Sequence, residues 1–359
     1  MISKVAVLKT NPQTVLEDYS RLLKSIDYDK FLPKDRQTAL KINISWHYFY
    51  PACSSTPWQL EGVLKTLLED GYEKNSIYAC HNRTVVVSAK KGERTNKHIN
   101  VVNKYGIRNI HLYEGEEWVR FKPKTKLLVL DKIFPEGIYI PKRFIGHNII
   151  HLPTMKTHVF TTMTGAMKNS FGGLLHEKRH YTHSVINETL VDLLIIQKEI
   201  HSGIFAVMDG TFAGDGPGPR CMIPHVKNYI LASNDQVAID AIAAKMMGFE
   251  PMSLKFIRLA HELGLGCGDL KKIEIVGEDI KDVNFHFQAN QNTFASRGQK
   301  MIYWGRLKPL EHLLLRTVIT PWSYLASIIY HDWFWYNFIG RKRVRNILKT
   351  DWGKLFLSY

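Results

Sequence analysis

The sequence predicts an α/β protein with a largely parallel sheet flanked by helices, followed by an aromatic, basic and helical C-terminal tail. Short runs rich in Val and Ile alternate with helical patterns over residues 1–290, as in sheets whose parallel strands are joined by helices. The segment "QANQNTFASRGQK" is polar and lacks periodicity, which indicates a boundary. We therefore expect an α/β domain over 1–290, in one unit or two sub-domains, and an extension over 291–359.

The first half of the chain contains most of the predicted parallel strands. The helix over 56–69 has the best-marked ends, because Ser55 or Thr56 can cap it, Pro57 suits its first position and Gly71 follows it. β-Rich runs cover residues 4–10, 38–44, 75–81, 108–114, 126–134 and 147–158, and helical spacing covers 16–26, 56–69 and 95–107.

The second half continues the alternation of helices and strands. An amphipathic helix over 185–200 precedes a buried strand over 204–210, which ends at Asp209 and leads into a Gly/Pro loop over 211–220. A strand over 228–235, helices over 235–248 and 251–266, and a last strand over 272–279 follow.

Composition narrows the classes of function. The formal charge of +15 and the pI near 9.5 favour phosphates, carboxylates or acidic lipid headgroups as partners. Nucleic acid is not expected, because the sequence contains no nucleic-acid motif. None of the four cysteines lies in a C-x-x-C pair, which excludes ferredoxin-type iron–sulfur and zinc-ribbon sites. Scattered thiols and an N-terminus without a signal-peptide pattern lead us to expect a cytoplasmic protein.

The tail combines aromatic residues with a basic excess. From Arg297 onward, 11 Lys and Arg stand against 3 Asp and Glu, a net charge of +8. The longest stretch without a charged residue or histidine in the apolar part, 313–339, is 14 residues, whereas a spanning helix needs about 20. Three interpretations stay open: the tail covers the main domain, it forms a homodimer contact, or residues 313–349 hold the protein at the inner face of a membrane.

The segment from Lys156 to His183 is the strongest candidate for a chemical site. It follows a predicted strand, and ligands of parallel α/β sheets bind at the carboxyl ends of strands. His158 is a candidate acid–base group because the pKa of histidine lies near neutrality. Lys156 and Lys168 can neutralise a carboxylate or phosphate, and a desolvated lysine can act as a nucleophile. The glycines around Gly172 would let the backbone approach a ligand.

Other predicted strand ends supply further candidates. Asp209 and Asp215 follow the strand over 204–210, where a carboxylate can orient a histidine, exchange protons or bind a metal. Asn43 and Thr56 lie before and at the start of the helix over 56–69, and helix N-termini bind anions. Ordinary turns and helix caps use the same residue types.

Three histidines suggest a metal site by their spacing. His176, His180 and His183 are placed i, i+4 and i+7, so on an α-helix they would share one face, as metal ligands can. An acid, either Glu177 or Asp209, would complete the donor set. The alternative is a basic surface loop in which three histidines align by chance.

Three segments resemble a known family. "LPTMKTHVFTTMTGAMKNSFGGL", "VMDGTFAGDGPGP" and "ASNDQVAIDAIAAKMMG" resemble the K-x-H…TG-x-x-KN-x-x-G, D…G-x-GP and D-x-VA-x-D-A motifs of domain of unknown function family 362 of bacteria and archaea. The resemblance covers residues 38 to 250 and places Lys156, His158, Lys168 and Asn169 in a family motif, while Gln236 stands where the family often has proline. It implies no reaction. Many members carry a C-terminal ferredoxin module, which this chain lacks, so no iron–sulfur cluster is implied.

A weaker similarity of spacing concerns the nickel-pincer lactate racemase family. In that family a catalytic histidine precedes a cofactor-holding lysine by ten positions, and a metal-ligating histidine follows. Here His158 and Lys168 are ten positions apart, and His183 follows fifteen positions later. The similarity implies a His/Lys site on a related architecture, and it does not imply nickel.

We therefore expect a cytoplasmic enzyme that acts on an anionic small molecule by redox chemistry or by proton or group transfer, with a metal ion as a candidate cofactor. The alternative is a non-catalytic anion- or metal-binding module held at a membrane surface. The expected catalytic residues are His158, Lys168 and Asp209, and the expected substrate-binding residues are Asn43, Thr56, Lys156, Asn169, Gly172 and Asp215.

Overall fold

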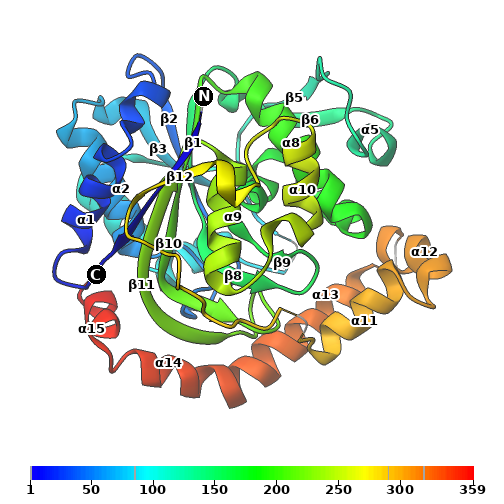
Figure 1. Cartoon of the computed structure of the whole chain (residues 1–359). Helices are drawn as coiled ribbons and strands as arrows, with labels where there is room; N and C mark the ends of the chain where they lie inside the picture. Colours follow the sequence, from blue (N-terminus) through cyan, green and yellow to red (C-terminus); the bar gives the residue numbers. More distant parts are fainter. Residues whose placement is uncertain (1, 85, 290, 318–319) are drawn as a thin grey trace.

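A sheet of ten strands organises the molecule (Figure 1). The computed structural model describes residues 2–84, 86–289, 291–317 and 320–359. Eight strands lie side by side in the order β12 (Ile273–Gly277), β1 (Ser3–Lys9), β11 (Ile223–Ser233), β10 (Gly203–Asp215), β7 (Asn148–Leu152), β2 (Thr38–Ile42), β3 (Ile77–His81) and β4 (Arg108–His111). Neighbours in this row pair in parallel, except for the two antiparallel pairings of β11. The predicted α/β fold with a largely parallel sheet is confirmed.

Two short strands complete the sheet, and a second small sheet lies apart from it. β8 (Thr154–His158) pairs with β10 and with β9 (Thr162–Met163). β5 (Trp118–Phe121) pairs with β6 (Ile138–Pro141). Every residue of β2, β3, β7 and β8 is buried, which is typical of parallel strands covered on both faces.

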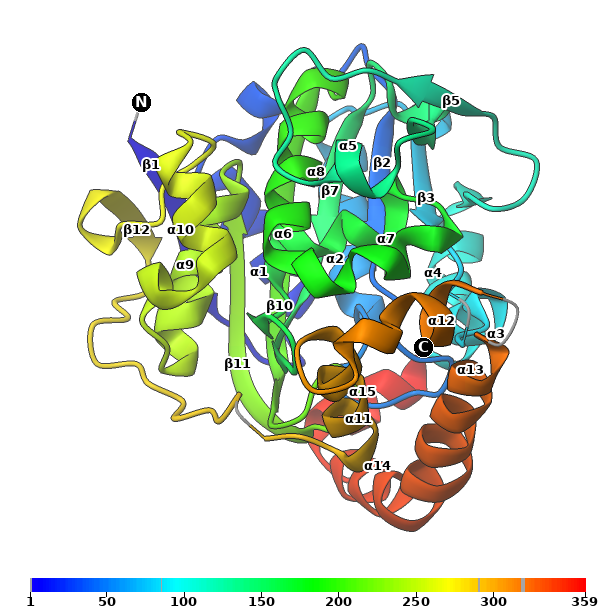
Figure 2. The ribbon, with the colours of Figure 1, turned by 90° about the vertical axis from the view of Figure 1, so that its right-hand side faces the viewer.

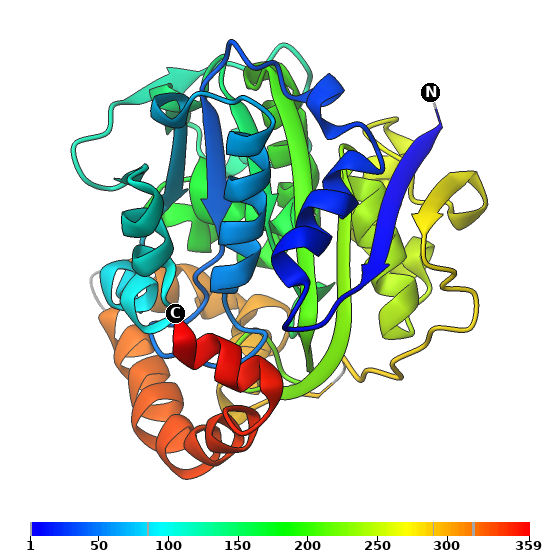
Figure 3. The same ribbon diagram turned by 90° about the vertical axis from the view of Figure 1, so that its left-hand side faces the viewer.

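Helices cover both faces of the main sheet. α1 (Val15–Lys24), α2 (Pro57–Glu69) and α4 (His98–Tyr105) share one hydrophobic core with the sheet, and Figure 3 shows the face with α1 and α2. Figure 2 shows the opposite face, where α6 (Gly165–Asn169), α7 (Phe171–Leu174), α8 (Ile186–Ile200), α9 (Gln236–Met247) and α10 (Lys255–Glu262) bury a second core. Thr56 caps α2 as predicted, accepting a hydrogen bond from the Gln59 N–H at 3.3 Å.

The segment over 126–134 is not the strand that its apolar pattern predicts. It forms the short helix α5 (Leu130–Ile133). Asp192 of α8 accepts hydrogen bonds from the backbone N–H groups of Leu128, Val129 and Leu130 at 2.7, 2.9 and 2.9 Å. A carboxylate from a distant helix thus satisfies the free N–H groups at the start of a helical turn, and the local sequence does not reveal it.

β10 is longer than predicted, and this changes the position of Asp209. The strand does not end at Asp209 but continues to Asp215, paired with β11 across an irregularity between Gly210 and Phe212. The first half of the predicted Gly/Pro loop, residues 211–215, is therefore strand. Asp209 lies in the interior of the sheet and not at its edge.

The tail follows as a chain of helices that runs below the main sheet in Figure 1. Trp335 lies 5.4 Å from Tyr50 between ring centroids, and Trp352 lies 5.1 Å from Trp58. The tail therefore packs on the main domain through its inner side. Its helices are α11 (Phe294–Tyr303), α12 (Glu311–Arg316), α13 (Pro321–Ile328), a π-helical segment (Ile329–Gly340), α14 (Arg341–Ile347) and α15 (Asp351–Ser358).

The outer side of the tail exposes apolar side chains. Trp333 and Phe338 are 64 % and 73 % exposed. In the described residues no single helix has the length and hydrophobicity needed to cross a membrane; the bent pair Lys308–Arg316 and Pro321–Ile347, with 88° between its helices, meets that requirement only when the two are taken together. We call the exposed side chains the tail stripe: Trp322, Leu325, Ile329, Trp333, Phe334 and Phe338.

Candidate active site

A cavity of about 980 Å³ lies between the carboxyl ends of the parallel strands and the tail. Its volume is at the upper end of the roughly 300–1,000 Å³ typical of small-molecule sites. The strand side is built by the ends of β2, β3 and β8 and by the segments that follow them, and the opposite side by α11, α12, α13 and the π-helical segment. The position agrees with the rule that α/β sheets bind ligands at the carboxyl ends of their strands.

The strand side of the cavity is basic. Lys41, Lys168 and Arg220 line it, and no Asp or Glu occurs among the described residues of its wall. These three cations make no ion pair with any carboxylate of the described chain. One guanidinium nitrogen of Arg220, Nη1, is buried and lacks a hydrogen-bond partner among the described residues. Since buried charges are stabilised by counter-charges, this wall suits an anion.

Lys168 is held in the cavity wall by α6 and by a buried acid. The two Asp240 carboxylate oxygens accept hydrogen bonds from the N–H groups of Ala166 and Met167 at 2.6 and 3.0 Å. Gly165 has φ of +76°, and a Cβ there would lie 2.3 Å from Asp240 Oδ1. Only glycine therefore allows this contact at the start of the turn that carries Lys168.

Burial changes the protonation of this wall. Desolvation, and then the charges of Lys156 and Arg179, lower the pKa of Lys168 to about 7. Desolvation also lowers the pKa of Lys41 to about 8. The Lys168 ammonium group lies 4.9 Å from the centroid of the Phe171 ring, which favours the cation. A pKa of about 7 would let Lys168 exchange a proton near neutral pH.

His158 carries its ring proton on Nε2 when the ring is neutral. Its Nδ1 accepts a hydrogen bond from the Phe160 N–H at 3.2 Å, so in the neutral ring the proton is on Nε2. Desolvation and the charge of Lys168 hold the pKa of His158 well below its usual value. The expectation of a histidine that titrates near neutrality is wrong for His158, because both effects oppose its protonation.

Three of the expected substrate-binding residues line the same cavity. Asn43 follows β2, Asn169 ends α6 and Gly172 lies in α7. Asn169 donates a hydrogen bond to the carbonyl oxygen of Lys41 at 2.9 Å. The adjacent Gly173 serves Lys41 and not a ligand, since a Cβ at Gly173 would lie 2.6 Å from Lys41 Cε.

The structure does not bring Asp209 and Thr56 to the described cavity wall. The Asp209 side chain is fully buried and accepts hydrogen bonds from Tyr19 Oη, Thr56 Oγ1 and Trp58 Nε1 at 2.8, 2.8 and 3.0 Å. It also accepts from the N–H and Oγ1 of Thr211 at 2.9 and 2.7 Å. These donors join β10 to α1 and α2, so Asp209 holds the sheet and two helices together.

Lys156 and Asp215 are also placed outside the described wall. Lys156 is buried behind it and donates a hydrogen bond to Ser45 Oγ, which belongs to the wall, at 3.2 Å. Desolvation lowers the pKa of Lys156 to about 8. Asp215, at the end of β10, accepts a hydrogen bond from the Gln288 N–H at 2.6 Å.

The three histidines at 176, 180 and 183 do not form one face. The segment Glu177–Val185 is a 3₁₀ helix, in which side chains three positions apart eclipse one another. His180 and His183 therefore share a face and line the cavity, whereas His176 is at the N-cap outside the described wall. The expected metal site of three histidines is therefore corrected: His176 does not belong with the other two. Positions i, i+4 and i+7 share one face of an α-helix but not of a 3₁₀ helix.

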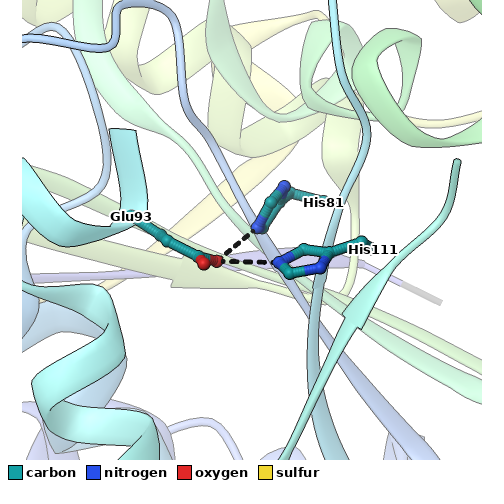
Figure 4. Close-up of side chains that lie close together, drawn as sticks. All are labelled: His81, Glu93 and His111. Carbon is teal, nitrogen blue, oxygen red and sulfur yellow. Dashed lines mark hydrogen bonds and ion pairs between the residues drawn. The ribbon is translucent and has the colours of Figure 1, made fainter. Parts of the chain in front are cut away.

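Three further features were not expected from the sequence: Lys41, Arg220 and a cluster of His81, Glu93 and His111 (Figure 4). The two histidines are the last residues of neighbouring parallel strands, β3 and β4, and are register partners. A histidine at the end of the predicted strand over 75–81 and another within the next predicted strand, over 108–114, were an available signal. Glu93, in α3 (Ala89–Thr95), has no local sequence feature that would mark it as a ligand.

The tail side of the cavity is apolar and continues to the outside. Trp322, Ile329 and Phe334 line the cavity and also belong to the exposed tail stripe. They therefore border its opening. Tyr303 connects the two sides, since its hydroxyl lies 3.4 Å from His183 Nδ1.

Comparisons with known proteins bear on the same region. A family model described as "Domain of unknown function (DUF362)" matches residues 38–245, which include Lys41, His158, Lys168 and Arg220, and it confirms the resemblance of the motifs. "Thylakoid-associated protein sll1697" of Synechocystis is 25 % identical over 120 residues, which are 33 % of this chain. The matched part spans 37 % of the length of that relative.

Proposed function

The chain belongs to the DUF362 family, and from the cavity in its family region we propose that it is an enzyme acting on an anionic small molecule with a large apolar body. The composition of the cavity wall carries this proposal: Lys41, Lys168 and Arg220 on one side, and apolar tail side chains on the other. A small polar anion would leave the apolar side unfilled. An uncharged lipid would bring no counter-charge to these desolvated cations. A molecule with both parts matches both sides.

The proposed reaction is a proton or group transfer in which Lys168 exchanges a proton with the substrate. A pKa of about 7 suits this role, because acid–base catalysis is most effective when the pKa lies near the working pH. His158, as a neutral Nε2–H donor, would stabilise negative charge that develops on the substrate. Arg220 and Lys41 would bind the anionic group. In this proposal Lys168 is the acid–base group and His158 stabilises negative charge, whereas the sequence predicted His158 as the acid–base group and Lys168 as the group that neutralises the anion.

A simple amphiphile tests the cavity. By isothermal titration calorimetry, decanoate should bind at least about tenfold more tightly than acetate or 1-decanol, since each of these satisfies only one side of the wall. Equal binding of decanoate and acetate would remove the apolar part of the proposal, and equal binding of decanoate and 1-decanol would remove the anionic part. Absence of decanoate binding to folded protein would contradict both.

Anion binding should weaken as the pH rises from 6 to 9. The carboxylate of decanoate stays ionised over this range, whereas Lys168 and Lys41 lose their protons through pKa values of about 7 and about 8. A bound anion favours the charged lysines, so binding takes up protons and affinity falls above these pKa values, by up to about tenfold per pH unit for each linked proton. Titrations at pH 6, 7.5 and 9 check this, and a flat profile would contradict the role of the two lysines.

The tail stripe supports a second part of the proposal, namely that the protein works at an anionic membrane surface. Trp322, Ile329 and Phe334 border the cavity opening, and the basic, largely exposed start of α14 follows the stripe, with Arg341, Lys342 and Arg345 exposed. Aromatic side chains beside basic ones are typical of helices that lie in the membrane interface. An amphiphile could then pass from the bilayer into the cavity. The name of the Synechocystis relative, thylakoid-associated, agrees with this location.

Vesicle co-sedimentation tests the membrane contact. The double variant Trp333→Ser/Phe338→Ser should lower binding to vesicles containing phosphatidylglycerol at least about tenfold, since two large apolar side chains no longer enter the interface. Leu263→Ser is the matched control, because Leu263 is 50 % exposed and lies outside the tail. Equal sedimentation of the double variant and the wild type, or equal binding to vesicles of phosphatidylcholine alone, would contradict an anionic membrane as the partner.

A further inference from the structure

His81, Glu93 and His111 point their polar atoms at one position (Figure 4). Glu93 Oε2 lies 2.8 Å from His81 Nε2 and 3.1 Å from His111 Nε2. Both imidazoles therefore meet the same carboxylate oxygen. In a tetrahedral site with metal–ligand distances of about 2.0–2.1 Å, neighbouring ligand atoms are about 3.3 Å apart. The three ligand atoms lie within 4.8 Å of one another, so side-chain shifts that bring them to about 3.3 Å apart would admit an ion.

A fourth donor lies beside these three. Asn109 Nδ2 is 2.8 Å from Glu93 Oε2 and 3.5 Å from His111 Nε2. The Asn109 Oδ1 atom is buried and has no hydrogen-bond partner within the described part of the chain. The two ends of an amide are exchanged by a 180° rotation. In that orientation the Asn109 carbonyl oxygen faces the cluster and can bind an ion there, while Nδ2 gives up its hydrogen bond to Glu93.

The surroundings orient His111 as in protein metal sites. His111 Nδ1 lies 3.3 Å from Glu114 Oε2, and metal-binding histidines usually donate their second N–H to a carboxylate or carbonyl. The side chains of His81 and Glu93 are almost completely buried, and that of His111 is 16 % exposed. The donors are therefore held in place and shielded from water, unlike those of a surface acidic cluster.

We propose that His81, Glu93 and His111, with Asn109 as an additional ligand, bind one divalent transition-metal ion such as Zn²⁺. Two imidazoles and one carboxylate suit zinc and its first-row neighbours, whereas Ca²⁺ and Mg²⁺ prefer oxygen ligands throughout. The site does not depend on the proposed function, since it consists of different residues. Because His81 also lines the cavity, the ion would add positive charge next to the anion-binding wall.

Metal titration of the full chain tests the site. After removal of metals with a chelator, we expect one equivalent of Zn²⁺ or Co²⁺ to bind and to raise the unfolding temperature. Glu93→Gln and His111→Gln should each lower the affinity at least about tenfold. His176→Gln is the matched control and should bind as the wild type does. Affinities that are unchanged in both Glu93→Gln and His111→Gln would overturn the proposal.

Two further measurements keep the test decisive if a variant does not fold. A zinc-soaked crystal of the wild type should show anomalous scattering between His81, Glu93 and His111, and a zinc position elsewhere, or none, would overturn the site. Decanoate titration of the metal-free and the metal-loaded protein separates the two proposals, because absence of decanoate binding to both forms would contradict the proposed function and leave the metal site unaffected.

Discussion

Lys168→Met should weaken decanoate binding by about 10- to 100-fold and make the folded protein more stable. The loss of binding follows from the loss of a charge-assisted interaction, worth about 1.5–3 kcal/mol in a buried site. The gain in stability has a different cause, namely the removal of a charge that lacks a counter-charge when no ligand is bound. In the absence of ligand the Lys168 ammonium has no carboxylate partner among the described residues, and burial lowers its pKa to about 7. Methionine keeps much of the length of the side chain and removes the buried charge.

The pH dependence of this stabilisation identifies its cause. The pKa of Lys168 is 10.5 in the unfolded chain and about 7 in the folded protein, so between these values the unfolded chain binds more protons. The wild type therefore gains stability as the pH rises from about 7 to about 10.5, and it carries the full penalty below pH 7. The excess stability of Lys168→Met should be largest below pH 7 and vanish near pH 10.5.

Chemical unfolding at pH 6 and pH 10, combined with decanoate titration at pH 6, measures both effects. Lys142→Met is the control, because Lys142 is an exposed lysine that pairs with Glu117 at 2.8 Å. It should change neither decanoate binding nor the pH dependence of stability. A stable Lys168→Met protein that binds decanoate as the wild type does would contradict the proposed anion site.

Asp209→Ala should destabilise the fold by about 3–5 kcal/mol, as expected when one member of a buried polar network is removed. The substitution leaves Tyr19, Thr56 and Trp58 without their shared acceptor, Asp209 Oδ2. These donors come from α1 and from the start of α2, so the contacts of two helices with β10 weaken together. Chemical unfolding measures the loss of free energy.

Asp209→Asn keeps the shape of the side chain and provides the functional readout if Asp209→Ala does not fold. Because Asp209 does not line the described cavity, the folded Asp209→Asn protein should bind decanoate within about twofold of the wild type. Asp35→Asn is the control for stability, since the Asp35 side chain is 74 % exposed. If folded, stable Asp209→Asn protein lost decanoate binding, Asp209 would have to take part in ligand binding, contrary to this prediction.

The two variants separate candidates that look alike in the sequence. Lys168 and Asp209 both belong to family motifs and both follow or end a predicted strand. The local pattern could place Lys168 near a strand end because β8 and the segment after it are short. It could not place Asp209, because whether β10 stops at residue 210 or continues to Asp215 depends on its pairing with β11.

Several members of the site depend on contacts that no local pattern contains. Lys41 lies within β2 as an ordinary strand residue, and its side chain reaches the cavity because Gly173, more than 130 positions later, leaves room for it. Arg220 reaches the same wall from a loop. His81 and His111 meet only because β3 and β4 are adjacent in the sheet and in register.

The sequence by itself determined the α/β class, most strands and helices, the capped start of α2, and the His158 and Lys168 part of the site. These features depend on the hydrophobic periodicity and capping of neighbouring residues, which act over a few positions. Only the tertiary structure decided that the tail closes a cavity, that Asp209 supports the fold, that 3₁₀ geometry separates His176 from His180 and His183, and that His81, Glu93 and His111 converge. These outcomes depend on strand order, register and packing between segments far apart in the chain, and a single sequence does not contain them in any local pattern.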